Sequence, residues 1–252
     1  DPATKSVTLK NKHATQYNQM YDRIVSYNAT QGFGVFISSN NAQYPYVTLD
    51  LHNTSGVNVG VALRLGIKST NTTCFTPNDN YYLQYEDGKI EKCNSNAYTA
   101  GLGSNTQGIY AIIPPGFKGK LYIDTANFKN EGSYTIAECD NAIFEFRSAK
   151  SAQAASAETP QELPFVINGF YVSKTLPKVI TAVNIKTGPA KLTYTKNQAL
   201  DLSGGVLEVV YSGGFYPSEE IPMTDSSIKV TGYNASTLGE QTLFLEVDNS
   251  GQ

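Results

Sequence analysis

The sequence of 252 residues has no tryptophan and only two histidines and three cysteines. Charged side chains are also scarce, at 16% of the chain against about 25% in a typical soluble protein. The 19 basic and 22 acidic residues leave a net charge of −3, so the chain lacks the basic surface that binds nucleic acid. No apolar run approaches the roughly 18 residues of a membrane-spanning helix, and we expect no membrane insertion.

The three cysteines, Cys74, Cys93 and Cys139, are an odd number and cannot all pair within the chain. Cys74 and Cys93 bracket a loop-rich stretch, and a disulfide between them would close a loop of about 20 residues and stabilise the fold by ~3 kcal/mol. The alternative is that all three thiols are free. The sequence has no CxxC motif and no Cys/His spacing that would indicate zinc.

What is abundant is glycine (21), tyrosine (17) and proline (11), together with many Asn, Thr and Ser, a composition typical of β-strands joined by turns. Apolar and polar residues alternate strictly over 46–52 and 57–67, with a turn cluster between, which predicts an antiparallel hairpin. The spacing of apolar residues over 17–25 favours a short helix. Further strands are expected at 32–37, 81–85, 109–113, 120–124, 142–146 and 165–172.

We place a domain boundary near Pro177, giving domains at 1–177 and 178–252. In the second domain, short strands are expected at 180–185, 191–194, 207–211, 228–230 and 242–247. Several short strands at this spacing indicate a small sandwich. The predicted fold class is therefore all-β throughout.

Four segments of the second domain, 200–211 (LDLSGGVLEVVY), 220–224, 230–234 and 238–243, resemble the group 3 bacterial immunoglobulin-like domain. The resemblance implies an immunoglobulin-like β-sandwich that acts as a spacer in multi-modular surface and secreted bacterial proteins. Residues 215–218 (FYPS) depart from that family, because they are longer and more aromatic than its usual short turn.

The first domain resembles a carbohydrate-binding jelly-roll module over residues 30–176, in the segments 59–65, 81–88 (YYLQYEDG), 113–119 (IPPGFKG) and 165–169. The resemblance implies a jelly-roll β-sandwich, a polysaccharide ligand, no enzymatic activity and an extracellular or cell-surface location. It also implies a monomeric part of a larger multi-modular protein. The chain departs from many such modules in having no tryptophan, the commonest platform for sugars.

Two places in the first domain have the residue types that bind sugars, an aromatic ring beside hydrogen-bonding groups. In the predicted hairpin, Tyr46 would lie across from Arg64 and flank a shallow groove; the alternative is an ordinary sheet face. The second place is a loop and the strand after it, in which one of two adjacent tyrosines should point into the core. Its candidate residues are Asn78, Asp79, Asn80, Tyr81 and Tyr82, with Tyr98 and Tyr110 nearby.

We expect no cofactor, although the side-chain oxygens of Asn78, Asp79 and Asn80 would suit a structural calcium. The predicted ligand is a polysaccharide, with starch or another α-glucan as the first candidate, bound by tyrosine stacking. One alternative is a protein-binding adhesion or scaffold module, which predicts a flat apolar patch. Another is a glycoside hydrolase fragment, which predicts two carboxylates roughly 5–9.5 Å apart across a cleft.

Overall fold

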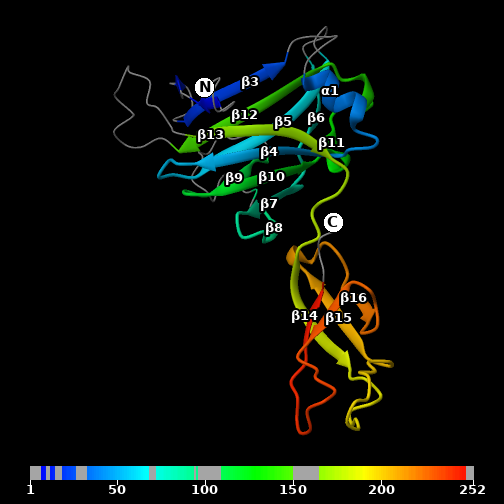
Figure 1. Ribbon diagram of the computed structural model, residues 1–252. Coiled ribbons are helices and arrows are strands. Elements are labelled where there is room, and N and C mark those ends of the chain that lie inside the picture. Colours follow the sequence, from blue (N-terminus) through cyan, green and yellow to red (C-terminus); the bar gives the residue numbers. More distant parts are fainter. Residues whose placement is uncertain are drawn as a thin grey trace. The chain divides into compact units, whose positions relative to one another are not determined.

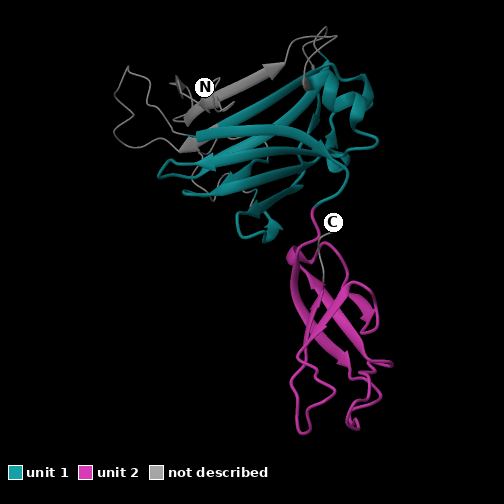
Figure 2. Ribbon diagram, in the orientation of Figure 1, with its two compact units in different colours: residues 1–176 teal, residues 177–252 magenta. Residues whose placement is uncertain are grey.

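The computed structural model describes residues 7–9, 12–14, 19–26, 33–67, 72–93, 95, 109–149 and 165–247. In this part of the chain nearly all regular structure is β-strand, and α1 (Phe33–Asn40) is its one α-helix (Figure 1). The all-β prediction is therefore confirmed. The chain divides into two compact units, Asp1–Leu176 (unit 1) and Pro177–Gln252 (unit 2) (Figure 2). No helix among the described residues is long and apolar enough to cross a membrane.

Unit 1 contains two antiparallel sheets. Sheet A has, in order, β1 (Val7–Leu9), β13 (Phe165–Ser173), β4 (Tyr46–Asn53), β10 (Lys118–Asp124), β7 (Tyr81–Tyr85) and β8 (Ile90–Lys92). Sheet B has β11 (Lys129–Asn130), β6 (Thr72–Thr76), β5 (Val59–Ile67), β12 (Asn141–Ala149), β3 (Gln19–Ser26) and β2 (Lys12–Ala14), and β9 (Ala111–Ile113) also pairs with β5. Two short 3-10 helices, η1 (Thr125–Asn127) and η2 (Ile136–Glu138), connect strands.

The chain crosses repeatedly between the two sheets, for example from β4 in sheet A to β5 in sheet B and from β6 back to β7 in sheet A. The two sheets pack face to face as a β-sandwich. One core cluster fills the space between the sheets, and inward-facing residues of β4 such as Leu49 and of β5 such as Leu63 are at most 2% exposed. Each such side chain contributes about 1.5–3 kcal/mol through burial. Side chains at alternating positions are therefore left on the outer faces.

The predicted hairpin of 46–52 with 57–67 is wrong, because β4 belongs to sheet A and β5 to sheet B. The side chain of Asn53, fully buried, organises the crossover: its Nδ2 donates to the carbonyls of Val57 (3.0 Å), Ile113 (2.9 Å) and Pro114 (2.9 Å). The backbone of Asn53 also pairs with Phe117. The chain therefore leaves sheet A at Asn53 instead of turning back along it.

The predicted helix over 17–25 and the predicted strand over 32–37 are both wrong. Residues 19–26 form β3, which pairs with β12, and Phe33–Asn40 is the helix α1. Polar side chains near the end of α1 donate hydrogen bonds to backbone carbonyls one turn earlier; Ser38 Oγ, for example, donates to Gly34 O at 2.9 Å. A Cβ on Gly34 would lie 2.9 Å from the backbone nitrogen of Ala142, so glycine permits the close contact of α1 with β12.

All three cysteines are buried and free. The Sγ of Cys93 donates to the carbonyl of Ile112 at 3.3 Å, and that of Cys139 donates to the carbonyl of Thr135 at 3.8 Å. The disulfide considered between Cys74 and Cys93 is therefore absent.

Unit 2 is a smaller sandwich of five described strands and a 3-10 helix, η4 (Ser212–Gly214). One sheet is β14 (Ile180–Thr187), β15 (Val206–Tyr211) and β16 (Glu219–Pro222), and the other is β17 (Ile228–Thr231) and β18 (Phe244–Val247). Residues from both sheets pack around Leu202, Leu207 and Met223. The strand expected at 191–194 is wrong, since this segment joins no ladder.

Candidate functional site

Four tyrosines lie together on the outer face of sheet A. The strand register places Tyr171 of β13 opposite Thr48 of β4, Thr48 opposite Tyr122 of β10, and Tyr122 opposite Tyr82 of β7. Tyr46 precedes Thr48 by two residues on β4 and so shares its face. We call Tyr46, Tyr82, Tyr122 and Tyr171 the tyrosine face.

The centre of the tyrosine face is filled and its flanks are partly exposed. Tyr122 is 4% exposed and Thr48 is fully buried, while Tyr46, Tyr82 and Tyr171 are partly exposed. The rings of Tyr46 and Tyr82 contact edge to face, with centroids 6.5 Å apart and planes at 66°. The hydroxyl of Tyr122 donates to Gln84 Oε1 at 3.0 Å. Buried side chains at the centre of the tyrosine face therefore support the partly exposed rings.

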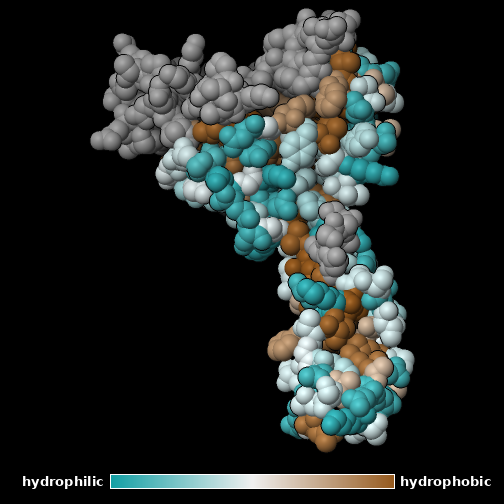
Figure 3. Space-filling view, viewed as in Figure 1, coloured by the Kyte–Doolittle hydropathy of each residue, from teal (hydrophilic) through white to brown (hydrophobic). Residues whose placement is uncertain are grey.

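Polar side chains border these rings. Lys120 faces Asp50 on β4 and Gln84 on β7, and its Nζ lies 5.7 Å from the ring centroid of Tyr171. At the β8 side, Lys92 Nζ lies 2.8 Å from Asp79 Oδ2, and this hydrogen bond is the main cause that lowers the pKa of Asp79. On the side shown in Figure 3, the described surface of unit 1 is mostly hydrophilic to neutral. The tyrosine face thus combines rings with hydrogen-bonding groups.

Two of the predicted site residues, Tyr46 and Tyr82, belong to the tyrosine face. Two others, Tyr81 and Tyr110, are fully buried, so neither can offer its ring to a ligand from solvent. Tyr81 alternates with Tyr82 and points into the core, where its hydroxyl donates to Ile109 O at 3.0 Å and burial raises its pKa well above the usual range. Tyr98 lies outside the described residues.

Arg64 does not face Tyr46, because the two residues lie in different sheets. On the outer face of sheet B its Nε lies 3.1 Å from Glu145 Oε2, and Glu145 also accepts a hydrogen bond of 2.6 Å from the hydroxyl of Tyr110. The shallow groove expected between Tyr46 and Arg64 is therefore wrong.

The loop residues Asn78, Asp79 and Asn80 do not act as one group. Asn80 is buried; its Oδ1 accepts from the backbone nitrogen of Asn78 at 2.8 Å and its Nδ2 donates to Asp124 O. Asp79 turns to Lys92 and Ser95. Across the described ranges, no group of three or more His, Cys, Asp or Glu side chains is placed to hold a metal ion. The calcium site stays a prediction.

Sequence reasoning missed Tyr122, Tyr171 and Lys120. The alternation in β10 and β13 places both tyrosines on the outer face of the sheet, whereas their chain neighbours, such as Leu121, point inward. What the pattern does not contain is strand order, and only the order β13-β4-β10-β7 joins these residues into one surface.

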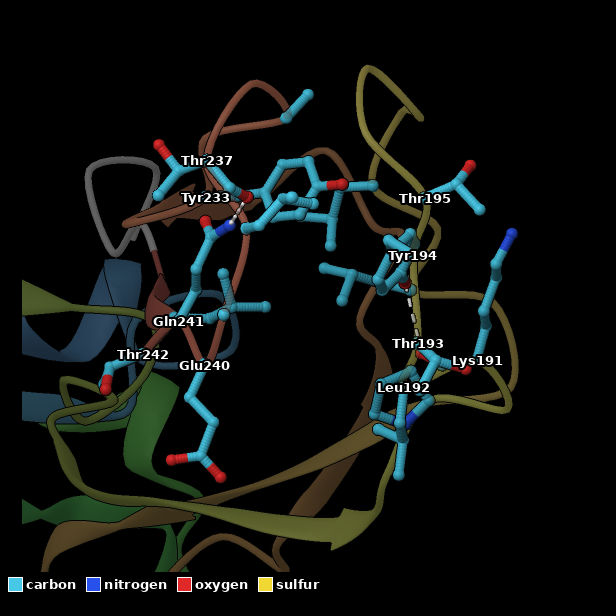
Figure 4. Close-up of a pocket in the computed structure, with 17 residues that line it drawn as sticks. Lys191, Leu192, Thr193, Tyr194, Thr195, Tyr233, Thr237, Glu240, Gln241 and Thr242 are labelled. Atoms are coloured by element: carbon cyan, nitrogen blue, oxygen red, sulfur yellow. Dashed lines mark hydrogen bonds between the residues drawn. The ribbon is translucent and has the colours of Figure 1, made fainter.

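Unit 2 has a hollow of about 620 Å³ between the segments 189–195 and 237–243 (Figure 4). The rings of Tyr194 and Tyr233 lie at its edge, with their centroids 5.5 Å apart. Their hydroxyls donate to the carbonyls of Asp201 (2.6 Å) and Gln198 (2.7 Å), so both tyrosines tie loops of unit 2 together. We prefer the tyrosine face as the candidate site, because it brings together tyrosines from four strands, whereas this hollow has two.

Comparisons of the chain with protein-family models, with curated proteins and with solved structures found no match.

Proposed function

We propose that the chain is a non-catalytic polysaccharide-binding module of a secreted or cell-surface, multi-modular bacterial protein. The observation that carries the proposal is the tyrosine face, in which partly exposed rings from β4, β7 and β13 lie around the buried ring of Tyr122 on β10 and share one surface with Lys120, Gln84 and Asp50. In this proposal unit 1 binds the glycan, and unit 2 acts as a spacer.

A tyrosine ring suits the apolar C–H face of a pyranose, and its hydroxyl and the neighbouring polar groups suit the sugar hydroxyls. The strands β13, β4, β10 and β7 are adjacent. The tyrosine face, from Tyr171 on β13 to Tyr82 on β7, therefore spans three inter-strand spacings, or roughly 14 Å. A surface of this length favours a chain of several sugar units over a single sugar. A curved α-glucan such as starch is our first candidate, because the ring surface is small and lacks an indole.

Binding without bond cleavage is supported by the state of the carboxylates that border the face. Asp50 accepts from Asn168 Nδ2 at 3.1 Å, Asp79 pairs with Lys92, and Asp124 accepts from the backbone of Ala126 at 3.0 Å. Each carboxylate is thus engaged inside the protein. A hydrolase would need one carboxyl group available as a general acid and another as a base or nucleophile.

Affinity electrophoresis of the full chain in gels containing starch, xylan, mannan, mucin or cellulose tests the proposal. We expect at least one soluble polysaccharide to retard the protein, and Tyr82→Ala and Tyr46→Ala to remove most of the retardation. The matched control is Tyr134→Ala, which also truncates a partly buried tyrosine packed against the unit 1 core but lies between β11 and η2. Retardation by none of the polymers, or equal loss in all three variants, contradicts the proposal.

A second candidate function, binding of a protein partner through unit 2, has one observation in its favour. Of the six large apolar side chains exposed in the described residues, all but Phe36 lie in unit 2: Val183, Ile185, Leu192, Leu238 and Phe244. Figure 3 shows hydrophobic surface on this unit. If no polysaccharide retards the chain, loss of self-association or partner capture in Leu192→Ser and Leu238→Ser would favour this function.

A further inference from the structure

The edge of β5 that faces away from β12 is shared by two strands with a gap between them. Residues 59–61 of β5 pair with β9, and residues 65–67 pair with β6. At Ala62 and Arg64, between these ladders, the described chain places no strand along this edge. A hollow opens at this point, although a continuous strand would have filled it.

The hollow has a volume of about 450 Å³, within the range of about 300–1,000 Å³ typical of small-molecule sites. We call it the gap pocket. Its lining includes Ala62, Arg64, Thr76, Pro77, Lys129 and Glu131. These residues come from β5, β6, β11 and the loops beside them, so the pocket is built from one side of sheet B.

A buried hydrogen-bond network fixes Arg64 in the wall of the gap pocket. Glu145 is 1% exposed and accepts from both Arg64 Nε (3.1 Å) and the hydroxyl of Tyr110 (2.6 Å), and Tyr110 is itself fully buried. The side chain of Arg64 is still 23% exposed. A buried ion pair adds little net stability in general, because desolvation opposes its attraction. Its consequence here is that the guanidinium is held in one orientation beside the pocket.

The rest of the lining offers donors and acceptors with balanced charge. Lys129 Nζ and Glu131 Oε1 are 3.0 Å apart, and the hydroxyl of Thr76 donates to the same Glu131 oxygen at 3.1 Å. Thr73 and Asn78 add a hydroxyl and an amide, and the partly exposed Ile109 adds apolar surface, while Ala62 and Pro77 are buried in the wall. Because each charged group of the lining has an opposite partner, the pocket favours a neutral ligand with several hydroxyl groups over an anion.

We propose that the gap pocket is a second saccharide site, which takes one neutral sugar unit such as the end or a branch of a glycan chain. The proposal rests on the proposed function only for the class of ligand. The loop from Pro77 to Asn80 leads from β6 in sheet B to β7 in sheet A, so the gap pocket and the tyrosine face lie on opposite sheets of unit 1. Two separate glycan segments could then bind one module and raise its avidity.

The test is a titration of the full chain with methyl glycosides of glucose, galactose, mannose and xylose, followed by NMR. We expect one of them to bind, with Arg64→Lys weakening binding about tenfold through loss of the planar guanidinium. Asn78→Ala, at an exposed position that does not threaten folding, should also weaken it. Lys118→Ala, on sheet A, serves as the matched control and should leave it unchanged.

Three results would overturn the proposal: binding of no methyl glycoside, equal binding by Asn78→Ala and the parent chain, or tighter binding of the charged methyl glucuronide. The affinity gels report separately on the tyrosine face. A chain that is retarded by a polysaccharide but binds no methyl glycoside retains the proposed function and lacks the second site. Binding of a methyl glycoside with no retardation by any polymer supports the second site and contradicts the proposed function.

Discussion

At the scale of single residues, the hydroxyls of Tyr122 and Tyr171 differ although the two side chains lie on the same face of sheet A, on either side of Thr48. Tyr122 donates to Gln84, whereas the buried hydroxyl of Tyr171 makes no hydrogen bond of good geometry within the described residues, although it lies near the Tyr122 hydroxyl. Burial first, and then the nearby Tyr171 hydroxyl, raise the pKa of Tyr122. A buried group without a partner carries its desolvation cost uncompensated.

The two hydroxyls can be compared by removing each in turn. Tyr122→Phe should lower the free energy of unfolding by about 1 kcal/mol, because the acceptor on Gln84 loses its donor. Tyr171→Phe should change it by less than about 0.5 kcal/mol, or raise it slightly. Urea unfolding of both variants measures the difference. Equal losses would show that the Tyr171 hydroxyl is satisfied in solution.

The cysteines give a prediction for pH. Burial raises the pKa of Cys93 and of Cys139 from 9.0 to about 12, so the folded state holds these protons more tightly than the unfolded state does. Stability is therefore unaffected by these thiols below about pH 9 and falls as the pH rises from there toward 12. Tyrosines also titrate in this window, so the comparison is with Cys93→Ala, whose stability should fall less steeply.

The same burial protects the thiols from alkylation. Iodoacetamide at pH 8 should label none of the three in the folded chain and all three after unfolding, since the thiolate is the reactive form. A titre of one thiol after unfolding would instead reveal a disulfide.

At the scale of strands and helices, alternation in the sequence predicted where most strands lie but not which strands are neighbours. The strands predicted over 46–52 and 57–67 are present as β4 and β5, yet the pairing was wrong because the buried amide of Asn53 bonds to carbonyls 60 and 61 residues away. Such long-range bonds leave no local pattern. The helix α1 was missed for a similar reason. A glycine at position 34 of this helix is needed only because α1 packs closely against β12, and this contact leaves no local pattern.

The candidate site shows the same division. Tyr46 and Tyr82 could be selected from sequence as tyrosines on polar faces of strands. Tyr122 and Tyr171 carry an equally clear alternation, but their relevance depends on β10 lying between β4 and β7 and on β13 lying beside β4. Tyr110 was selected by its proximity to a loop and proved buried. Sequence thus reveals which face a side chain takes, and the long-range topology decides which side chains share it.

Two strand glycines beside the tyrosine face make a matched pair. In β10, Gly119 has φ +156°, and a Cβ there would lie 2.1 Å from the carbonyl oxygen of Gln84 on β7. In β13, a Cβ on Gly169 would meet only the Asp50 Cβ, at 3.8 Å. Gly119→Ala should therefore separate β10 from β7, lower the free energy of unfolding by about 3 kcal/mol and weaken glycan binding.

Gly169→Ala should change stability by less than about 0.5 kcal/mol, because its new methyl group meets ordinary contact distances. Thermal unfolding and affinity electrophoresis of the two variants give the comparison. A stable Gly119→Ala variant with full retardation would mean that the β10–β7 pairing does not hold the tyrosine face together.

At the scale of the whole molecule, the two units have separate cores. The cluster of unit 1 runs from Ile37 to Ile167, and that of unit 2 is built on Leu202, Leu207 and Met223, with no residue in common. A domain with its own hydrophobic core can fold independently. The proposed division of labour, with glycan binding in unit 1 and a spacer in unit 2, requires this independence.

Met223→Ala in the full chain tests that requirement. Met223 is 3% exposed in the unit 2 core, so its truncation should lower the stability of unit 2 by about 2–5 kcal/mol. Calorimetry should show one transition moved to lower temperature and a second unchanged, while Leu192→Ala, at a side chain 78% exposed, should move neither. Retardation by polysaccharide should be unaltered in Met223→Ala even between the two transitions, where only unit 1 is folded. Loss of binding together with unit 2 unfolding would show instead that the spacer takes part in glycan recognition.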